Sequence, residues 1–132
     1  MEVLVCQLPF ILHIVVESPA VLAFGLFPSS TLTRPQPHAH AVIRQYALLL
    51  LSSIIIAAAS LVQSGRTLHE PTPAGASTAF AFALYHLGPV ARAWARLRTK
   101  RNRGSLFVHP VSHLVVHAAC AILFALQLAW LI

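Results

Sequence analysis

The sequence is poor in charged residues and has almost no acidic ones. Its 132 residues include nine Lys or Arg and three Asp or Glu, so only 9% of the chain is charged. Soluble domains usually carry about 25% charged residues, whereas 58% of this chain is hydrophobic and its mean hydropathy is +0.76. Because a chain of this length cannot hide so much apolar surface from water, the composition excludes an ordinary soluble domain and indicates lipid as the solvent.

Cysteine is also scarce, and the familiar catalytic motifs are absent. Cys6 and Cys120 lie inside apolar segments, and their spacing excludes a disulfide framework, a CxxC redox pair and a zinc finger. The sequence holds no GxSxG, P-loop or GxGxxG motif, and no GxxxG helix-dimer motif. The net charge of +6 gathers mainly in one loop between apolar segments, so we interpret it as a sign of membrane topology and expect no nucleic-acid partner.

Four apolar segments are present, separated by short stretches rich in Pro, Gly, Ser and Arg. A membrane-spanning helix needs about 20 mainly apolar residues, and short loops make neighbouring helices antiparallel. The sequence therefore predicts an all-α membrane protein, a single domain over residues 1–132 with four transmembrane helices in an up-down-up-down bundle. The expected spans are residues 3–27, 41–62, 74–95 and 110–132.

Prolines and histidines refine these boundaries. Gly88-Pro89 is expected to kink or end the third helix, while Pro110 suits the first position of the fourth, which makes His109 its expected N-cap. The HAH triplet at residues 38–40 falls in the first loop and is interpreted as solvated loop histidines. No Lys or Arg precedes the first apolar segment, which is atypical of a cleaved signal peptide, so this segment is predicted to remain a span.

The distribution of Lys and Arg predicts the orientation. The first-loop side carries Arg34 and Arg44, the third loop carries six basic residues, and the opposite face has Arg66 alone. Because cytoplasmic loops are enriched in Lys and Arg, the Arg-rich loops are expected in the cytoplasm and both termini on the lumenal or extracellular side. Two tryptophans suit interfacial positions on opposite faces, and these are Trp94 and Trp130.

Polar side chains inside the spans are the most informative residues, because lipid rejects them and they usually face the bundle interior. Each helix carries a polar stripe, and the stripe of the fourth helix, from His109 to Gln127, covers an arc of about 80°. The stripe of the first helix contains His13, and that of the second contains Ser53. With about 1.5 Å of rise per residue, one residue of each helix falls at a similar depth. The four residues that we expect in this layer are Glu17, Tyr46, His86 and His117.

Two interpretations of this polar layer need no cofactor. In the first, the side chains only bond to one another and fix the helix register, and the protein is a structural or accessory membrane component. In the second, the layer is an isomerase-like acid–base site for a lipophilic substrate. Glu17 would then be the base or acid, and Tyr46 would donate a hydrogen bond. His117 and His86 would be the proton-exchanging partners of Glu17.

Two further interpretations involve ions. His113 and His117 lie four residues apart and could bind a metal ion together with Glu17 or His86. His86 and His117, on different helices, could instead hold a haem. A chain of His and Glu side chains could also conduct protons or ions. The sequence itself does not specify a cofactor.

In helix count, and in carrying His and Glu inside its spans, the chain resembles small four-span families such as the DoxX-like proteins and the emopamil-binding sterol isomerases. By analogy, this resemblance implies an isomerase-like activity. No motif of either family matches residue by residue, so the resemblance assigns no catalytic residues. The expected partners are the lipid bilayer and either a lipophilic small molecule or other membrane proteins.

Overall fold

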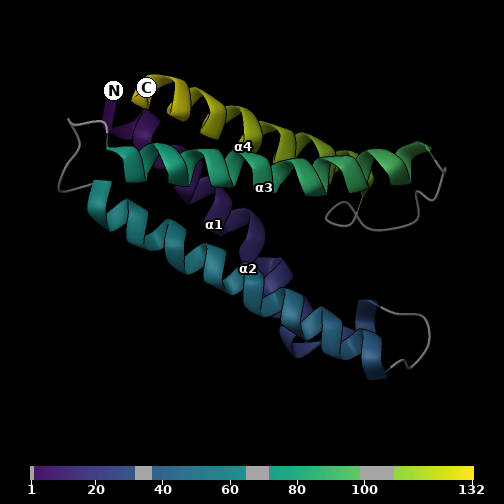
Figure 1. The fold of residues 1–132 in the computed structure, drawn as a ribbon. Helices are drawn as coiled ribbons and strands as arrows, with labels where there is room; N and C mark the ends of the chain where they lie inside the picture. Colours follow the sequence, from purple (N-terminus) through teal and green to yellow (C-terminus); the bar gives the residue numbers. More distant parts are fainter. Residues whose placement is uncertain (1, 32–36, 65–71, 99–108) are drawn as a thin grey trace. The chain divides into compact units, whose positions relative to one another are not determined.

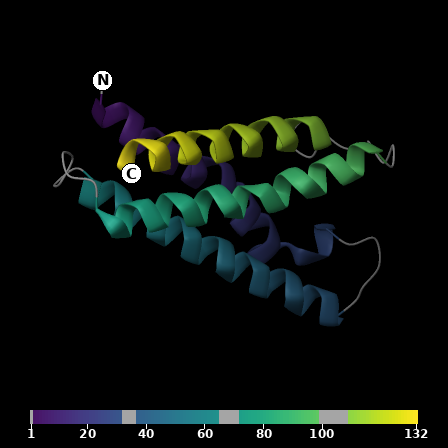
Figure 2. The same ribbon diagram turned by 45° about the horizontal axis from the view of Figure 1, so that its top comes forward.

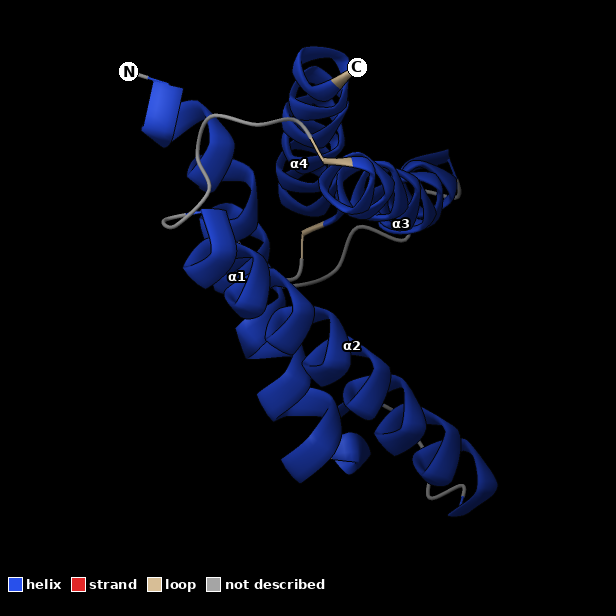
Figure 3. Ribbon diagram, turned by 60° about the vertical axis from the view of Figure 1, so that its left-hand side comes forward, coloured by secondary structure: helices blue, strands red, loops and turns tan. Residues whose placement is uncertain are grey.

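The computed structural model describes residues 2–31, 37–64, 72–98 and 109–132, and almost all of them are helical (Figure 1). Figure 3 shows the described residues coloured by secondary structure, with helices in blue and short loop pieces in tan. The prediction of an all-helical chain is confirmed, although α2 and α3 are longer than predicted. The elements are α1 (Glu2–Leu26), the short 3-10 helix η1 (Pro28–Thr31), α2 (Pro37–Ser64), α3 (Pro73–Arg98) and α4 (Pro110–Leu131).

Three of the four long helices are apolar enough to cross a membrane. The apolar stretches are Cys6–Leu26 of α1, Pro37–Gln63 of α2 and Pro110–Leu131 of α4. The 22 residues of α4 extend about 33 Å at 1.5 Å per residue, which matches a hydrocarbon core of about 30 Å. The prediction of a helical membrane protein is thus supported, while α3, which is less apolar, does not by itself satisfy the same criterion.

The helices begin where proline allows a helix to begin. Pro37, Pro73 and Pro110 are the first residues of α2, α3 and α4, at the position where a missing N–H costs nothing. The predicted N-cap at His109 is confirmed, since its Nδ1 accepts a hydrogen bond of 3.3 Å from the N–H of Val111. Capping satisfies backbone donors that the first helical turn leaves without a partner.

One local expectation is wrong, and one of the two alternatives for Gly88-Pro89 is excluded. His38 and His40 lie in the first turn of α2 and not in a loop, because the helix starts at Pro37. The helix α3 does not end at Gly88-Pro89 but continues to Arg98. Pro89 removes one backbone hydrogen bond of the helix, and the kink expected at this position stays a prediction.

The chain divides into two compact units, Met1–Pro9 with Leu68–Ile132, and Phe10–Thr67. In the first unit, α3 and α4 run antiparallel and side by side (Figure 2). Gly75 at the start of α3 lies against Leu131 at the end of α4, and farther along α3 His86 contacts His117. The unit therefore has one long seam between two helices, which we call the α3–α4 seam.

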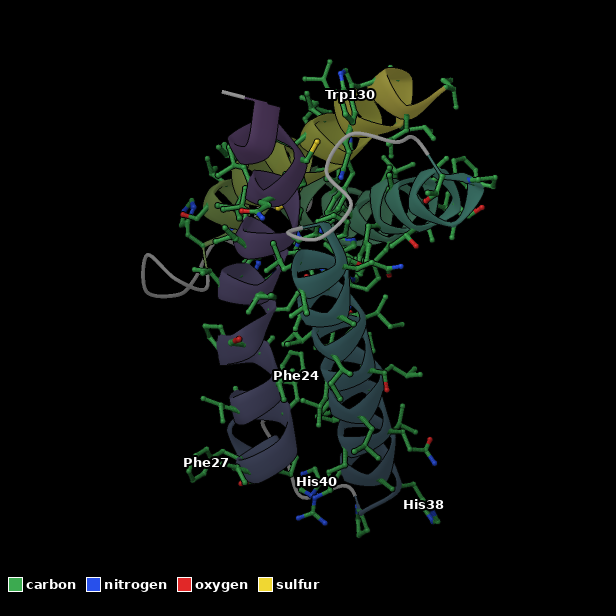
Figure 4. The ribbon with its side chains drawn as sticks, turned by 90° about the vertical axis from the view of Figure 1, so that its left-hand side faces the viewer. Phe24, Phe27, His38, His40 and Trp130 are labelled. Atoms are coloured by element: carbon green, nitrogen blue, oxygen red, sulfur yellow. The ribbon has the colours of Figure 1, made fainter. Side chains whose placement is uncertain are left out.

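In the second unit, the part of α1 from Phe10 onward lies antiparallel to α2. The rings of Phe24 and Tyr46 are 5.8 Å apart, and Phe24 points from α1 towards α2 (Figure 4). Next to them, a Cβ placed on Gly25 would lie 3.8 Å from the Cβ of Ala47. Small residues at this level allow the two helix backbones to approach closely.

Many large apolar side chains lie on the helix surfaces, among them Leu49 on α2 and Val115 on α4. The buried residues include apolar ones, such as Leu50 and Phe124, together with several polar ones. Exposed apolar surface is what lipid as a solvent requires, and it agrees with a membrane location. The buried polar side chains are His13, Glu17, His86, His117 and Gln127.

Candidate functional site

A pair of histidines makes a direct polar contact between two helices in the α3–α4 seam. The Nδ1 atoms of His86 and His117 lie 3.0 Å apart, and both side chains are buried. Both residues belong to the layer predicted from the sequence, and the structure brings these two together. The roles proposed for them in catalysis stay predictions.

The geometry of this pair restricts its protonation. A hydrogen bond between two Nδ1 atoms needs a proton on one of them and a lone pair on the other. The accepting ring is therefore neutral, so the pair carries at most one positive charge. Such a pair can hold, accept or release one proton at a defined position, which is the chemistry that a structural network and an acid–base site have in common.

Aromatic rings surround the pair. Phe124 of α4 stacks on His86 at 5.9 Å between ring centroids, with an interplanar angle of 17°. Phe124 also stacks on Phe82 of α3 at 5.0 Å between ring centroids, with an interplanar angle of 17°. The ring of Tyr85 meets His86 edge-on at 5.1 Å. This packing excludes water, which strengthens a hydrogen bond made inside the seam.

His113, one turn before His117, differs from the pair. Its ring is nearly parallel to that of His117, with centroids 5.8 Å apart and an interplanar angle of 6°, but its side chain is exposed. On α4, His117 therefore faces the seam, whereas His113, one turn nearer the start of the helix, faces outward. The prediction that His113 and His117 ligate a metal stays a prediction.

The 3.0 Å separation also bears on the haem hypothesis. The two axial ligands of a haem lie on opposite sides of the iron, about 4 Å apart with the porphyrin between them. The Nδ1 atoms of His86 and His117 bond to each other directly, so these two nitrogens leave no room for a haem iron between them. Two nitrogens that bind one zinc ion at about 2.0–2.1 Å lie about 3.3 Å apart, which is closer to the observed distance.

A second polar contact joins α1 to α2 within the other unit. The Nε2 of His13 lies 3.0 Å from the Oγ of Ser53, and this hydroxyl donates to the carbonyl of Leu50 at 2.7 Å. A hydroxyl has one proton, so Ser53 must accept from His13. This chain of bonds fixes the proton of His13 on Nε2.

Glu17 lies one turn beyond His13 on the same face of α1, and its side chain is only 4% exposed. Tyr46 pairs with Phe24, which is seven residues, or about 10 Å of helix, beyond Glu17. Tyr46 therefore lies nearer the end of α1 than Glu17 does, and the two do not share one level as the depth count had suggested. Their proposed roles as acid or base and as hydrogen-bond donor stay predictions.

Gln127 makes a contact that the sequence did not predict. Its Nε2 donates a hydrogen bond of 3.1 Å to the backbone carbonyl of Cys6, which joins α4 to the start of α1. Among the described residues, its Oε1 has no hydrogen-bond partner although it is buried. The polar stripe on α4 indicated that Gln127 faces inward. Its acceptor could not be predicted, because every residue has a backbone carbonyl and the sequence does not indicate which one is used.

No family model matches the sequence, and the comparisons with curated proteins and with solved structures find no significant match. The functional argument consequently depends on the residues of this chain alone.

Proposed function

We propose that the chain is a small multispan membrane protein with a structural or accessory role, in which buried polar side chains fix the pairing of its helices. The hydrogen bond between His86 and His117 carries this proposal. One imidazole donates a proton from its Nδ1 and the other accepts it. Stacked aromatic rings pack around the two histidines. A polar network of this kind defines the register of two helices in lipid, where the hydrophobic effect does not hold them together.

The proposal includes a fourth span. α3 pairs with α4 from Gly75 beside Leu131 to His86 beside His117. If α4 crosses the membrane, a helix that runs alongside it over this length crosses too. The apolar side chains of α4 and of its own exposed face then surround α3, although it is the least apolar of the four helices.

The proposed orientation follows from eight Lys or Arg on one face and one on the other. In a background in which both native cysteines are replaced by alanine, the single substitutions Ser64→Cys, Ser105→Cys and Ile132→Cys test span number and orientation together, using a membrane-impermeant thiol reagent. Four spans with cytoplasmic Arg-rich loops predict that the thiol introduced by Ser105→Cys reacts only from the cytoplasmic side. The thiols introduced by Ser64→Cys and by Ile132→Cys should react only from the opposite side. Reaction at positions 64 and 105 from the same side would refute the fourth span, and reaction at position 105 from the non-cytoplasmic side would refute the orientation.

An acid–base enzyme acting on a lipophilic substrate is the second candidate, and one observation favours it. Glu17 is a buried carboxyl group, one turn from a histidine whose Nε2 proton is fixed by Ser53. Burial of a carboxyl group beside an oriented imidazole is a frequent arrangement at catalytic sites. The structural role has broader support, because three separate polar contacts join helices.

A comparison of wild type with Glu17→Gln separates the two candidates. Each purified protein is incubated with a cellular lipid extract, and the lipids are then followed by mass spectrometry and chromatography that resolves isomers. The structural proposal predicts the same lipid composition after both incubations. A product that wild type forms and Glu17→Gln does not form would overturn it in favour of the enzyme, provided that both proteins keep the same helix content.

A further inference from the structure

The C-terminal end of α3 combines positive charge with an exposed indole. Arg92, Arg96 and Arg98 are exposed, and Trp94 is 52% exposed. The guanidinium carbon of Arg98 lies 5.5 Å from the ring centroid of Trp94, which is a cation–π contact. This contact holds the charge of Arg98 beside the indole on the outer surface of the helix. We call Trp94 and Arg98 the Trp94–Arg98 pair.

The antiparallel pairing of α3 and α4 shows where the Trp94–Arg98 pair lies along the helix axis, relative to the start of α4. Trp94 lies eight residues beyond His86 on α3, and Pro110 lies seven residues before His117 on α4. Trp94 is therefore level with the first residue of α4, and Arg98 lies about one turn farther out. Figures 1 and 2 both show α3 extending past the start of α4 at this end. Tryptophan at such a level is typical of the membrane interface.

The sequence at this end of α3 is strongly basic. Six Lys or Arg lie between Arg92 and Arg103, and no Asp or Glu follows Glu70. Arginine in the last turn of a helix is favoured by the helix dipole alone. The dipole does not explain, however, why Arg98 is held against an exposed indole, where its guanidinium can share a ligand with the indole N–H.

We infer that the Trp94–Arg98 pair binds the phosphate of an anionic phospholipid headgroup in the cytoplasmic leaflet. The inference rests on the span and orientation proposed above for α3. The guanidinium would donate hydrogen bonds to the phosphate oxygens, and the indole N–H would donate to the same headgroup region. The negative surface of the leaflet complements the positive charge of Arg98.

Fluorescence quenching of Trp94 tests the inference. Replacement of the other tryptophan, by Trp130→Phe, leaves Trp94 as the single indole. This protein is reconstituted in phosphatidylcholine vesicles that contain an equal fraction of either brominated phosphatidylglycerol or brominated phosphatidylcholine. The inference predicts stronger quenching by the anionic lipid. Equal quenching by the two lipids would overturn it.

Charge-matched variants separate a site from general attraction. Arg98→Gln should lower the preference for the anionic lipid about fivefold, as expected for one basic residue at a charged surface. Arg44→Gln removes the same charge from α2, where Arg44 is also exposed, and should keep the preference. Equal losses in both variants would reduce the site to diffuse attraction and overturn the inference. Arg98→Lys, which keeps the charge, should retain part of the preference, and unchanged circular dichroism confirms folding.

A soluble competitor identifies the source of the phosphate. Inorganic phosphate, added at constant ionic strength, should leave the lipid preference unchanged, because a headgroup site is selected by its position in the membrane. Loss of the preference at millimolar phosphate would overturn the assignment to lipid. If the cysteine experiment reverses the orientation while the preference persists, the proposed topology fails and the lipid site stands.

Discussion

The Nδ1 atoms of His86 and His117 lie 3.0 Å apart between two antiparallel helices, and at least one of the two rings is neutral. The first prediction concerns this bond. In protein labelled with 15N on histidine, NMR should show one protonated and one unprotonated Nδ1 for the pair, with a scalar coupling across the hydrogen bond. Detection of protons on both Nδ1 atoms would contradict the geometry. His109, which caps α4 from outside the seam, is an internal reference.

Ser53 is expected to matter more than its neighbour Ser52. Ser53→Ala removes the acceptor of the buried His13 Nε2–H, and a buried donor without a partner costs about 1–3 kcal/mol. Ser52 is exposed and donates only to the carbonyl of Leu48 in its own helix, so Ser52→Ala should change the unfolding free energy by less than about 0.5 kcal/mol. Thermal and denaturant unfolding in bilayers measure both. Equal effects of the two variants would show that the contact to His13 is not formed.

Position 25 is expected to tolerate an alanine side chain but not a larger one. A Cβ there would lie 3.8 Å from the Cβ of Ala47, an ordinary contact, so Gly25→Ala should be tolerated. Gly25→Leu would force α1 and α2 apart and should destabilise the protein by about 1–3 kcal/mol, as overpacking usually does. The difference between the two unfolding free energies is the measured quantity. If the leucine variant is as stable as the alanine variant, the close approach of α1 and α2 is refuted.

Gln127 should be replaceable by an apolar residue. Gln127→Leu loses one hydrogen bond to the carbonyl of Cys6 but also removes a buried Oε1 that has no partner among the described residues. Because an unsatisfied buried group costs about 1–3 kcal/mol, the two effects offset each other, and the variant should be about as stable as wild type. Unfolding in bilayers tests this, and a loss above about 2 kcal/mol would mean that the glutamine is fully satisfied in the membrane.

Much of the fold could be predicted from the sequence because lipid imposes strong rules on helices. The length of each apolar segment indicated the helices, and the sequence His109-Pro110 indicated where α4 starts. The inward orientation of His86 and His117 followed from depth and helical period, since polar side chains avoid lipid. These features depend only on local sequence and on the solvent.

Features that depend on contact between helices could not be predicted in the same way. Predicting the contact of His13 with Ser53 requires the register of α1 against α2, which the sequence does not give. The depth estimated from residue counts placed Tyr46 level with Glu17, whereas Tyr46 contacts Phe24, about two turns farther along α1. The expectation that all polar residues on one face of a helix point inward also did not distinguish His113, which is exposed, from His117, which is buried. One turn of helix near its end is enough to change which surface a side chain faces.

The most direct test of the central claim is a double-mutant cycle on the histidine pair. His86→Phe, His117→Phe and the double variant keep a ring at each position, so stacking on Phe124 is largely preserved and the hydrogen bond is isolated. If the pair fixes the α3–α4 seam, the unfolding free energies in bilayers should show a coupling of about 0.6–1.7 kcal/mol, the range for interhelical hydrogen bonds in membranes. Additive effects, within about 0.3 kcal/mol, would contradict a structural role for this bond.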